Sequence, residues 1–279
     1  MQIISVVRNF EMYNKLVKNN PYNNGAVFNC FDNTIHNNHI PQHYNNFLDN
    51  YNYANPDWLV FCHEDFEVKE FLPPKLQNID KNKIYGSIGR EFFTSNLSYI
   101  LKYQRAAIGQ IEESDKTGKN KFLNGVFYKT PPLAVGTLDC QCIIVHSSLV
   151  KKYNLRFDKN LSFDLYAEDF CISAREAHNI KTNVLQIKCQ HWSSGNVGER
   201  FLQQFFYLQQ KYSKAKNIYL TTCTSYKIIG RSKTASHFIY FAFKIRKFFY
   251  RIKIKNDVYR IKLFGIPIFG KKYLLAKAG

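Results

Sequence analysis

Short apolar runs alternate with segments of helical spacing along the first two thirds of the chain. Residues 3–7 (IISVV), 25–31 (GAVFNCF) and 57–62 (DWLVFC) are apolar runs rich in β-branched and aromatic residues, which are typical of buried strands. Residues 10–19 and 45–53 between them have the spacing of amphipathic helices. This order predicts strand–helix–strand units.

The same alternation continues to about residue 190. We expect a strand over 84–89, a later strand within 133–145, helices over 147–153 and 164–178, and a strand over 184–187. Strands that alternate with helices predict an α/β fold with a mainly parallel sheet flanked by helices. Ligands of such sheets bind beyond the carboxyl ends of the strands.

Charge is unevenly spread along the chain. Of the formal net charge of +18, residues 226–279 carry +13, with 14 Lys or Arg against one acid. Residues 237–255 (HFIYFAFKIRKFFYRIKIK) mix aromatic residues with cations, which favours a surface helix on anionic lipid. A helix packed on the rest of the protein, or a nucleic-acid contact, is the alternative. No base-reading motif accompanies the charge, so we expect no specific nucleic-acid partner.

Several classes of protein are disfavoured by what the sequence lacks. Residues 1–7 are too short, and lack a preceding basic segment, for a secretory signal. No apolar run reaches the roughly 18 residues that a spanning helix needs. The seven cysteines lack paired CxxC spacing and are expected to be reduced thiols. We therefore expect a cytoplasmic protein, peripheral at the inner face of the cytoplasmic membrane.

The segment 58–68 (WLVFCHEDFEV) is the strongest local feature. His63 and Asp65 are two residues apart at the end of a predicted strand, so their side chains should project in the same direction. A carboxylate there can bind Mg²⁺ or Mn²⁺, whose open coordination positions accept a diphosphate. A polar strand end with a solvated pair of acids is the alternative.

Other polar residues fall at predicted strand ends and at a helix start. Glu168 and Asp169 open a helix, where they are either capping acids or a general base. His191 follows a strand and is either a surface imidazole or a ligand of metal or diphosphate. Asp32 and Asn33 end the second strand, where such sheets meet a base and ribose. Neither GxGxxG nor a P-loop is present.

Taken in order, these segments resemble a known family. The succession IISVVRN, FDNT, YNNF, WLVFCHEDFEV, TLDCQCIIVHSSLV, LRFDKNLSFDLYAEDFCISA and HWSSGN is similar to bacterial glycosyltransferase-like proteins of the streptomycin-biosynthesis type, relatives of glycosyltransferase family 2. The resemblance covers about residues 1–215. It implies a GT-A fold, a nucleotide-sugar donor with a UDP-sugar as the first candidate, Mn²⁺ or Mg²⁺ as cofactor, and an inverting displacement.

The resemblance also implies roles for single residues. Asp65 and His191 would bind the metal, with His63 standing where relatives carry the first aspartate of a DxD motif. Asp169 would be the general base in first place, with Glu168 beside it. Residues expected to bind the nucleotide sugar are Arg8, Asn9, Asp32, Asn33, His63, Glu64 and Asp139.

The sequence therefore predicts a glycosyltransferase domain over 1–215 and a basic region over 216–279 that attaches to an anionic membrane surface. The acceptor would be a cell-surface glycan or a lipid-linked molecule, as in the synthesis of polysaccharide or lipooligosaccharide. Two other classes of function use the same residues. One is a noncatalytic basic module for nucleic acid or anionic lipid, and the other is a metal-dependent hydrolase.

Overall fold

The chain forms two compact units in a computed structural model, Met1–Gly230 and Arg231–Gly279. The structure describes residues 1–35, 38–102, 106–193, 198–223, 226–228, 250–255, 258–263 and 266–272. The sequence placed the boundary at 215. The strands β16 (Ile218–Leu220) and β17 (Lys227–Ile228) belong to the first unit instead.

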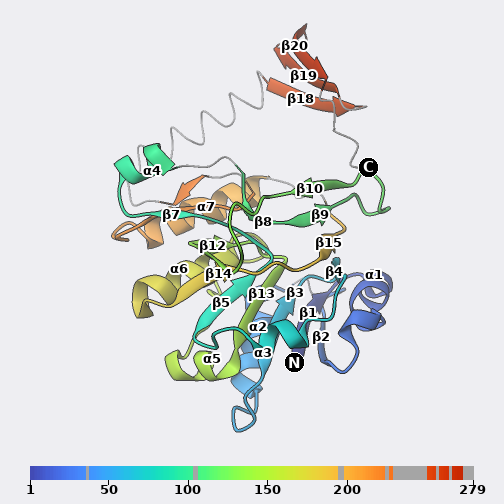
Figure 1. Cartoon of the computed structure of the whole chain (residues 1–279), viewed down its shortest axis with the longest axis vertical. Coiled ribbons are helices and arrows are strands. Elements are labelled where there is room, and N and C mark those ends of the chain that lie inside the picture. Colours follow the sequence, from blue (N-terminus) through green and yellow to red (C-terminus); the bar gives the residue numbers. More distant parts are fainter. Residues whose placement is uncertain are drawn as a thin grey trace. The chain divides into compact units, whose positions relative to one another are not determined.

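A seven-stranded sheet is the framework of the first unit (Figure 1). Its order is β11 (Leu133–Val135), β14 (Lys181–Val184), β5 (Lys83–Gly86), β13 (Cys142–His146), β3 (Trp58–Cys62), β1 (Gln2–Val7) and β2 (Val27–Asp32). β13 is antiparallel to both of its neighbours and β11 is antiparallel to β14, so five strands share one direction. The predicted α/β fold class is confirmed.

The central strands are buried because their sequences are continuous apolar runs. Every residue of β3 and of β13 is buried, as expected for strands that are covered on both faces. The aromatic rings of Tyr44, Phe61 and Phe157 pack beside β3 at centroid distances of 4.8 to 5.2 Å. This packing fixes the end of β3, from which the segment His63–Glu64–Asp65 continues.

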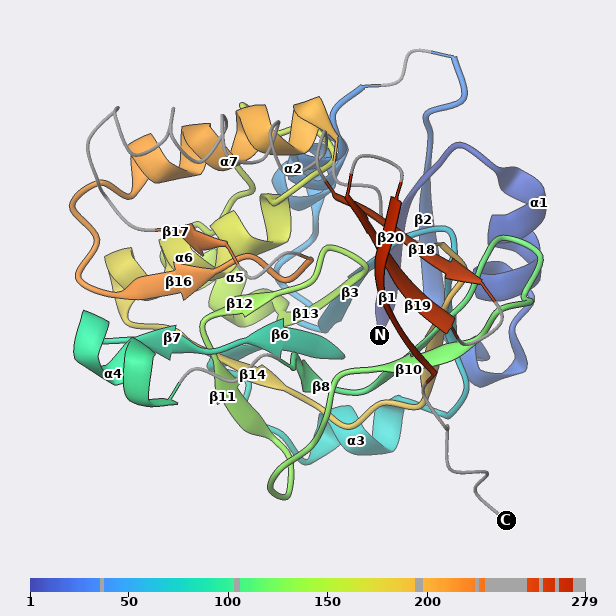
Figure 2. The ribbon, with the colours of Figure 1, turned by 90° about the horizontal axis from the view of Figure 1, so that it is seen from above.

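Helices flank the sheet, with α1 and α6 at its opposite ends (Figures 1 and 2). The Asn9 side chain caps α1 by accepting from the Met12 amide, and the left-handed Asn179 ends α6. The helices are α1 (Phe10–Tyr13, continued by a π-helix over Asn14–Lys18), α2 (Ile40–Asn50), α3 (Pro73–Gln77), α4 (Asn96–Lys102), α5 (Ser147–Tyr153), α6 (Tyr166–His178) and α7 (Glu199–Lys211), with a 3₁₀ turn over Pro21–Asn23. The helix expected over 45–53 begins earlier, at Ile40.

Three smaller sheets complete the first unit, and four of their strands lie within the stretch 90–132, for which the sequence predicted no elements. The first sheet contains β10 (Phe122–Asn124), β9 (Ile111–Glu113), β15 (Cys189–His191) and β4 (Phe66–Val68). The second contains β12 (Thr137–Leu138), β6 (Ile88–Arg90) and β8 (Ile108–Gly109), and the third joins β7 (Phe92–Phe93) to β16 and β17. The strand expected over 84–89 is divided between β5 and β6.

The second unit contains an antiparallel sheet of β18 (Tyr250–Lys255), β19 (Val258–Leu263) and β20 (Ile266–Lys272). The surface helix expected over 237–255 does not form at 250–255, and 237–249 lies outside the described residues. The reason is the period of the sequence, because apolar residues and cations alternate strictly from 250 to 255. Over the described residues, no helix combines the length and apolarity needed to span a bilayer.

Candidate functional site

A cavity of about 450 Å³ lies where β1, β2 and β3 end and the antiparallel β13 begins. This is the carboxyl edge of the sheet, where ligands of α/β proteins gather. The cavity brings together eight of the residues singled out from the sequence, namely Arg8, Asn33, His63, Glu64, Asp65, Asp139, Glu168 and His191.

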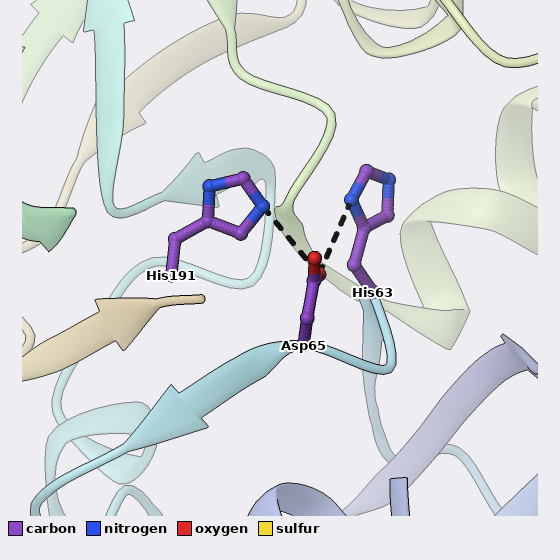
Figure 3. Close-up of side chains that lie close together, drawn as sticks. All are labelled: His63, Asp65 and His191. Carbon is purple, nitrogen blue, oxygen red and sulfur yellow. Dashed lines mark ion pairs between the residues drawn. The ribbon is translucent and has the colours of Figure 1, made fainter. Parts of the chain in front are cut away.

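Two histidines converge on one carboxylate in this cavity (Figure 3). Asp65 Oδ1 lies 3.4 Å from His191 Nε2 and 3.9 Å from His63 Nδ1. One ligand atom from each of the three residues falls within 4.8 Å of the others. The side chains are only 12 to 16% exposed. Two imidazoles and a carboxylate at this spacing can serve as ligands of a divalent cation such as Mn²⁺.

Further hydrogen bonds fix the orientation of both imidazoles. Glu113 Oε2 lies 3.1 Å from His191 Nδ1, which leaves Nε2 directed toward Asp65. The Tyr166 hydroxyl lies 2.8 Å from His63 Nε2 and donates its proton to the Cys140 carbonyl at 2.8 Å. His63 Nε2 must therefore donate, so the lone pair of a neutral His63 is on Nδ1, facing Asp65. Outer hydrogen bonds of this kind orient metal-binding histidines.

The pKa values of the three groups reflect their mutual contact. Burial alone would raise the pKa of Asp65, but the hydrogen bond and charge of His191 and the charge of His63 lower it to about 2. Burial lowers the pKa of His63, and Asp65 only partly offsets this. Burial opposes the charge of His191, yet Asp65 and Glu113 raise its pKa to about 10. The carboxylate is thus ionised and His63 neutral at neutral pH.

Glu168 lines the same cavity from the first turn of α6 and is 1% exposed. Its Oε1 accepts from the Thr222 amide at 3.1 Å and from the Thr222 hydroxyl at 2.7 Å. Cys140 Sγ lies 3.6 Å from its Oε2. Burial and the charge of Asp139 raise the pKa of Glu168 to about 7 against these hydrogen bonds. A carboxyl group that titrates near neutral pH can act as a general base.

Asp169, the first choice for the base in the sequence, is not among the residues that line the cavity. Its Oδ1 lies 2.7 Å from Lys211 Nζ and accepts from the Tyr212 hydroxyl at 2.6 Å. With 1% exposure, Asp169 anchors α6 to the end of α7. The structure therefore brings the neighbouring residue, Glu168, to the site in its place.

Several residues that were expected to bind the nucleotide sugar form hydrogen bonds with backbone groups around the site. Glu64 accepts from the amides of Arg8 and Asn9 and so holds the segment after β1. Asn33 and Asn38 exchange side-chain-to-backbone hydrogen bonds of 2.7 and 2.9 Å, which close the loop after β2. Asp32 accepts from the Thr34 amide and hydroxyl. Neither Asn9 nor Asp32 lines the cavity, whereas Arg8 and Asn33 do.

Sequence reasoning missed three residues that act on the site through others. Glu113 lies in the stretch without clear periodicity, Tyr166 is an aromatic residue within an ordinary helix, and Thr222 is distant in the chain from the residue it contacts. No local signal marks any of them, because each is recognised only by its partner in space.

Comparisons with known proteins give structural likenesses only. No family model and no curated protein sequence matches the chain. A crystal structure of S. aureus TarS 1-349 is 15% identical, with a TM-score of 0.47, over 77% of this chain and 65% of that one. The same protein in complex with UDP is 14% identical, with a TM-score of 0.43, over 88% and 71%. GalNAc-T7 with UDP, GalNAc and Mn²⁺ is 9% identical, with a TM-score of 0.44, over 77% and 51%.

The chain thus spans less than two thirds of the length of two of these structures. At such identities the likeness concerns the fold alone. What the site can do must follow from its own geometry.

Proposed function

We propose that the chain is an inverting glycosyltransferase that moves a sugar from a nucleotide-sugar donor to a hydroxyl group of an acceptor. A UDP-sugar is the first candidate for the donor. One observation carries the proposal. A cation-ligand set (His63, Asp65, His191) and a buried carboxyl group that titrates near neutral pH (Glu168) line one cavity.

The three ligand residues fit a divalent cation, with Mn²⁺ or Mg²⁺ as the candidates and Mn²⁺ better suited to imidazole. His63 Nδ1, His191 Nε2 and an Asp65 oxygen would hold it. When bound, the cation supplies positive charge against the leaving diphosphate. A ligating imidazole must be neutral, so binding would release the proton that Asp65 and Glu113 hold on His191.

The residues of the chain supply the remaining steps. Arg8 lines the cavity and brings a guanidinium to the diphosphate. Asn33, which follows β2 and lines the cavity, would contact the nucleoside, and Asp139 lines the cavity beside Glu168. Glu168 takes the proton of the acceptor hydroxyl as its oxygen attacks the anomeric carbon. Attack opposite to the leaving diphosphate inverts the configuration of that carbon.

A thermal-shift screen of nucleotide sugars tests the donor assignment. We expect a UDP-sugar to raise the melting temperature with Mn²⁺ and not with EDTA, because only the metal-loaded cavity neutralises the diphosphate. Asp80→Asn, a change on the surface after α3, is the matched control for Asp65→Asn and should leave the response unchanged. Release of free sugar without transfer to any acceptor would favour the hydrolase instead.

We propose that the second unit attaches the protein to an anionic membrane surface, at the inner face of the cytoplasmic membrane, where it would meet its acceptor. The register of β18 and β19 sets Arg251 opposite Lys262, and Lys253 opposite Arg260. Like charges directly opposite destabilise a sheet, so an anionic partner would relieve the repulsion.

Two assays across one salt series decide whether the partner of the second unit is lipid or DNA. They are flotation with phosphatidylserine vesicles and retention on nonspecific DNA. Binding to vesicles and not to DNA is expected. Retention on DNA without flotation would contradict the membrane proposal and indicate a nucleic-acid partner.

A further inference from the structure

One residue outside the sequence-predicted set makes two hydrogen bonds to the candidate base. Thr222 is 8% exposed and donates both its amide and its hydroxyl to Glu168 Oε1. The two residues are 54 positions apart. Buried hydrogen bonds to a carboxylate are among the stronger ones in proteins, because water competes poorly for either partner.

The backbone that carries Thr222 is held firmly. The preceding strand, β16, pairs with β7 and β17. The Thr137 hydroxyl donates to the Leu220 carbonyl at 2.7 Å. The turn after β16 is closed by hydrogen bonds of 2.9 Å from the Thr221 amide to the Tyr226 carbonyl and from the Tyr226 amide to the Thr221 hydroxyl. Thr222 is thus a fixed donor.

Apart from Thr222 and the Cys140 thiol, whose sulfur lies 3.6 Å from Oε2, the surroundings of Glu168 disfavour its ionised form. Asp139 and Cys140 face it from the turn before β13, Cys171 lies one turn later on α6, and Cys223 follows Thr222. None of these groups brings a positive charge. Burial and the charge of Asp139 raise the pKa of Glu168, and the hydrogen bonds from Thr222 lower it.

We propose that Thr222 is a positioning residue for proton transfer: it fixes Oε1 of Glu168 and leaves Oε2, whose neighbour at 3.6 Å is Cys140 Sγ, as the oxygen that receives the acceptor proton. The inference rests on the proposed function for the role of Glu168. The geometry of the Thr222–Glu168 contact is independent of that function. Loss of the hydroxyl removes one of the two donors to Oε1, so Glu168 becomes harder to ionise and its carboxylate is held less firmly.

The direct test is the titration of the Glu168 carboxyl carbon by ¹³C NMR, assigned by its absence in Glu168→Gln. In Thr222→Val, which keeps the shape and removes the hydroxyl, we expect the midpoint to rise by about one pH unit. Thr222→Ser should retain the wild-type midpoint. Thr137→Val separates loss of the Thr222 hydroxyl from a loosened backbone, since it removes the hydroxyl that donates to the Leu220 carbonyl and leaves both donors of Thr222 in place; its midpoint should rise less than that of Thr222→Val. An unchanged midpoint in Thr222→Val overturns the inference.

Turnover gives the second readout, with the UDP-sugar that most raises the melting temperature as probe. The acidic limb of the rate profile should move upward with the NMR midpoint in Thr222→Val, so that turnover at pH 7 falls about fivefold and recovers above pH 8. A merely structural role would lower the rate equally at every pH. If Glu168→Gln retains full turnover, the proposed base is wrong, whereas the NMR result still decides the contact.

Discussion

Replacement of Glu168 by glutamine should change how the stability of the protein depends on pH. The side chain is 1% exposed, and its pKa is raised from 4.5 to about 7 by burial and by Asp139. Because the folded pKa is the higher one, the folded state holds the proton more tightly. The stability contributed by that proton is present below about pH 4.5 and is lost as pH rises through 7.

The magnitude follows from the two pKa values. Between pH 5 and pH 8 the free energy of unfolding of the wild type should fall by roughly 2.5 kcal/mol more than that of Glu168→Gln, since each pKa unit corresponds to about 1.4 kcal/mol. For a folded unit of this size that is about 5 to 10 °C in melting temperature. Glutamine keeps the shape and can still accept from Thr222, so the fold should survive.

Calorimetry or urea unfolding at pH 5, 6, 7 and 8 measures the difference. Glu176→Gln, on the same helix, is the control. Burial would raise the pKa of Glu176, but hydrogen bonds from Tyr219 and Asn217 lower it. Its contribution to stability is therefore lost only as pH falls below about 4.5, and its stability curve should run parallel to that of the wild type between pH 5 and pH 8. Parallel stability curves for wild type and Glu168→Gln would refute the reasoning, and with it the case for Glu168 as a base near neutral pH.

Three further predictions concern other carboxylates of the first unit. Asp65→Asn should keep the fold, by circular dichroism, and lose the Mn²⁺-dependent rise in melting temperature; a retained rise would exclude Asp65 as a ligand. Glu113→Gln should weaken Mn²⁺ binding about 10- to 100-fold in calorimetric titration, because the acceptor that orients His191 loses its negative charge; unchanged affinity would contradict this. Asp169→Asn should lower the free energy of unfolding, measured in urea, by about 2 kcal/mol, because it weakens the contact with Lys211. Turnover per folded molecule should persist. If Asp169→Asn loses turnover while its stability is unchanged, Asp169 and not Glu168 is the general base.

The main sheet could be predicted largely from the sequence, because buried strands have distinctive composition. The run 58–62 reads as an interior strand and becomes β3. The direction of β13 could not be predicted, since an apolar run does not encode whether its neighbours are parallel. The strands within 90–132 are two or three residues long, too short for a period to appear.

The candidate site was predictable where chemistry and position agree. His63, Asp65 and His191 are polar residues at strand ends, and the structure brings them together. The choice between Glu168 and Asp169 was not predictable. Adjacent residues of a helix differ by about 100° in direction, so only the packing of α6 decides which carboxylate enters the cavity.

The order in which the ribosome makes these segments has a consequence of its own. Asp65 is synthesised early, whereas Thr222, which fastens Glu168, follows more than half a chain later. At 5 to 20 residues per second, roughly 8 to 30 s separate the two during translation. The candidate site of a nascent chain is therefore complete only when nearly all of the first unit has emerged.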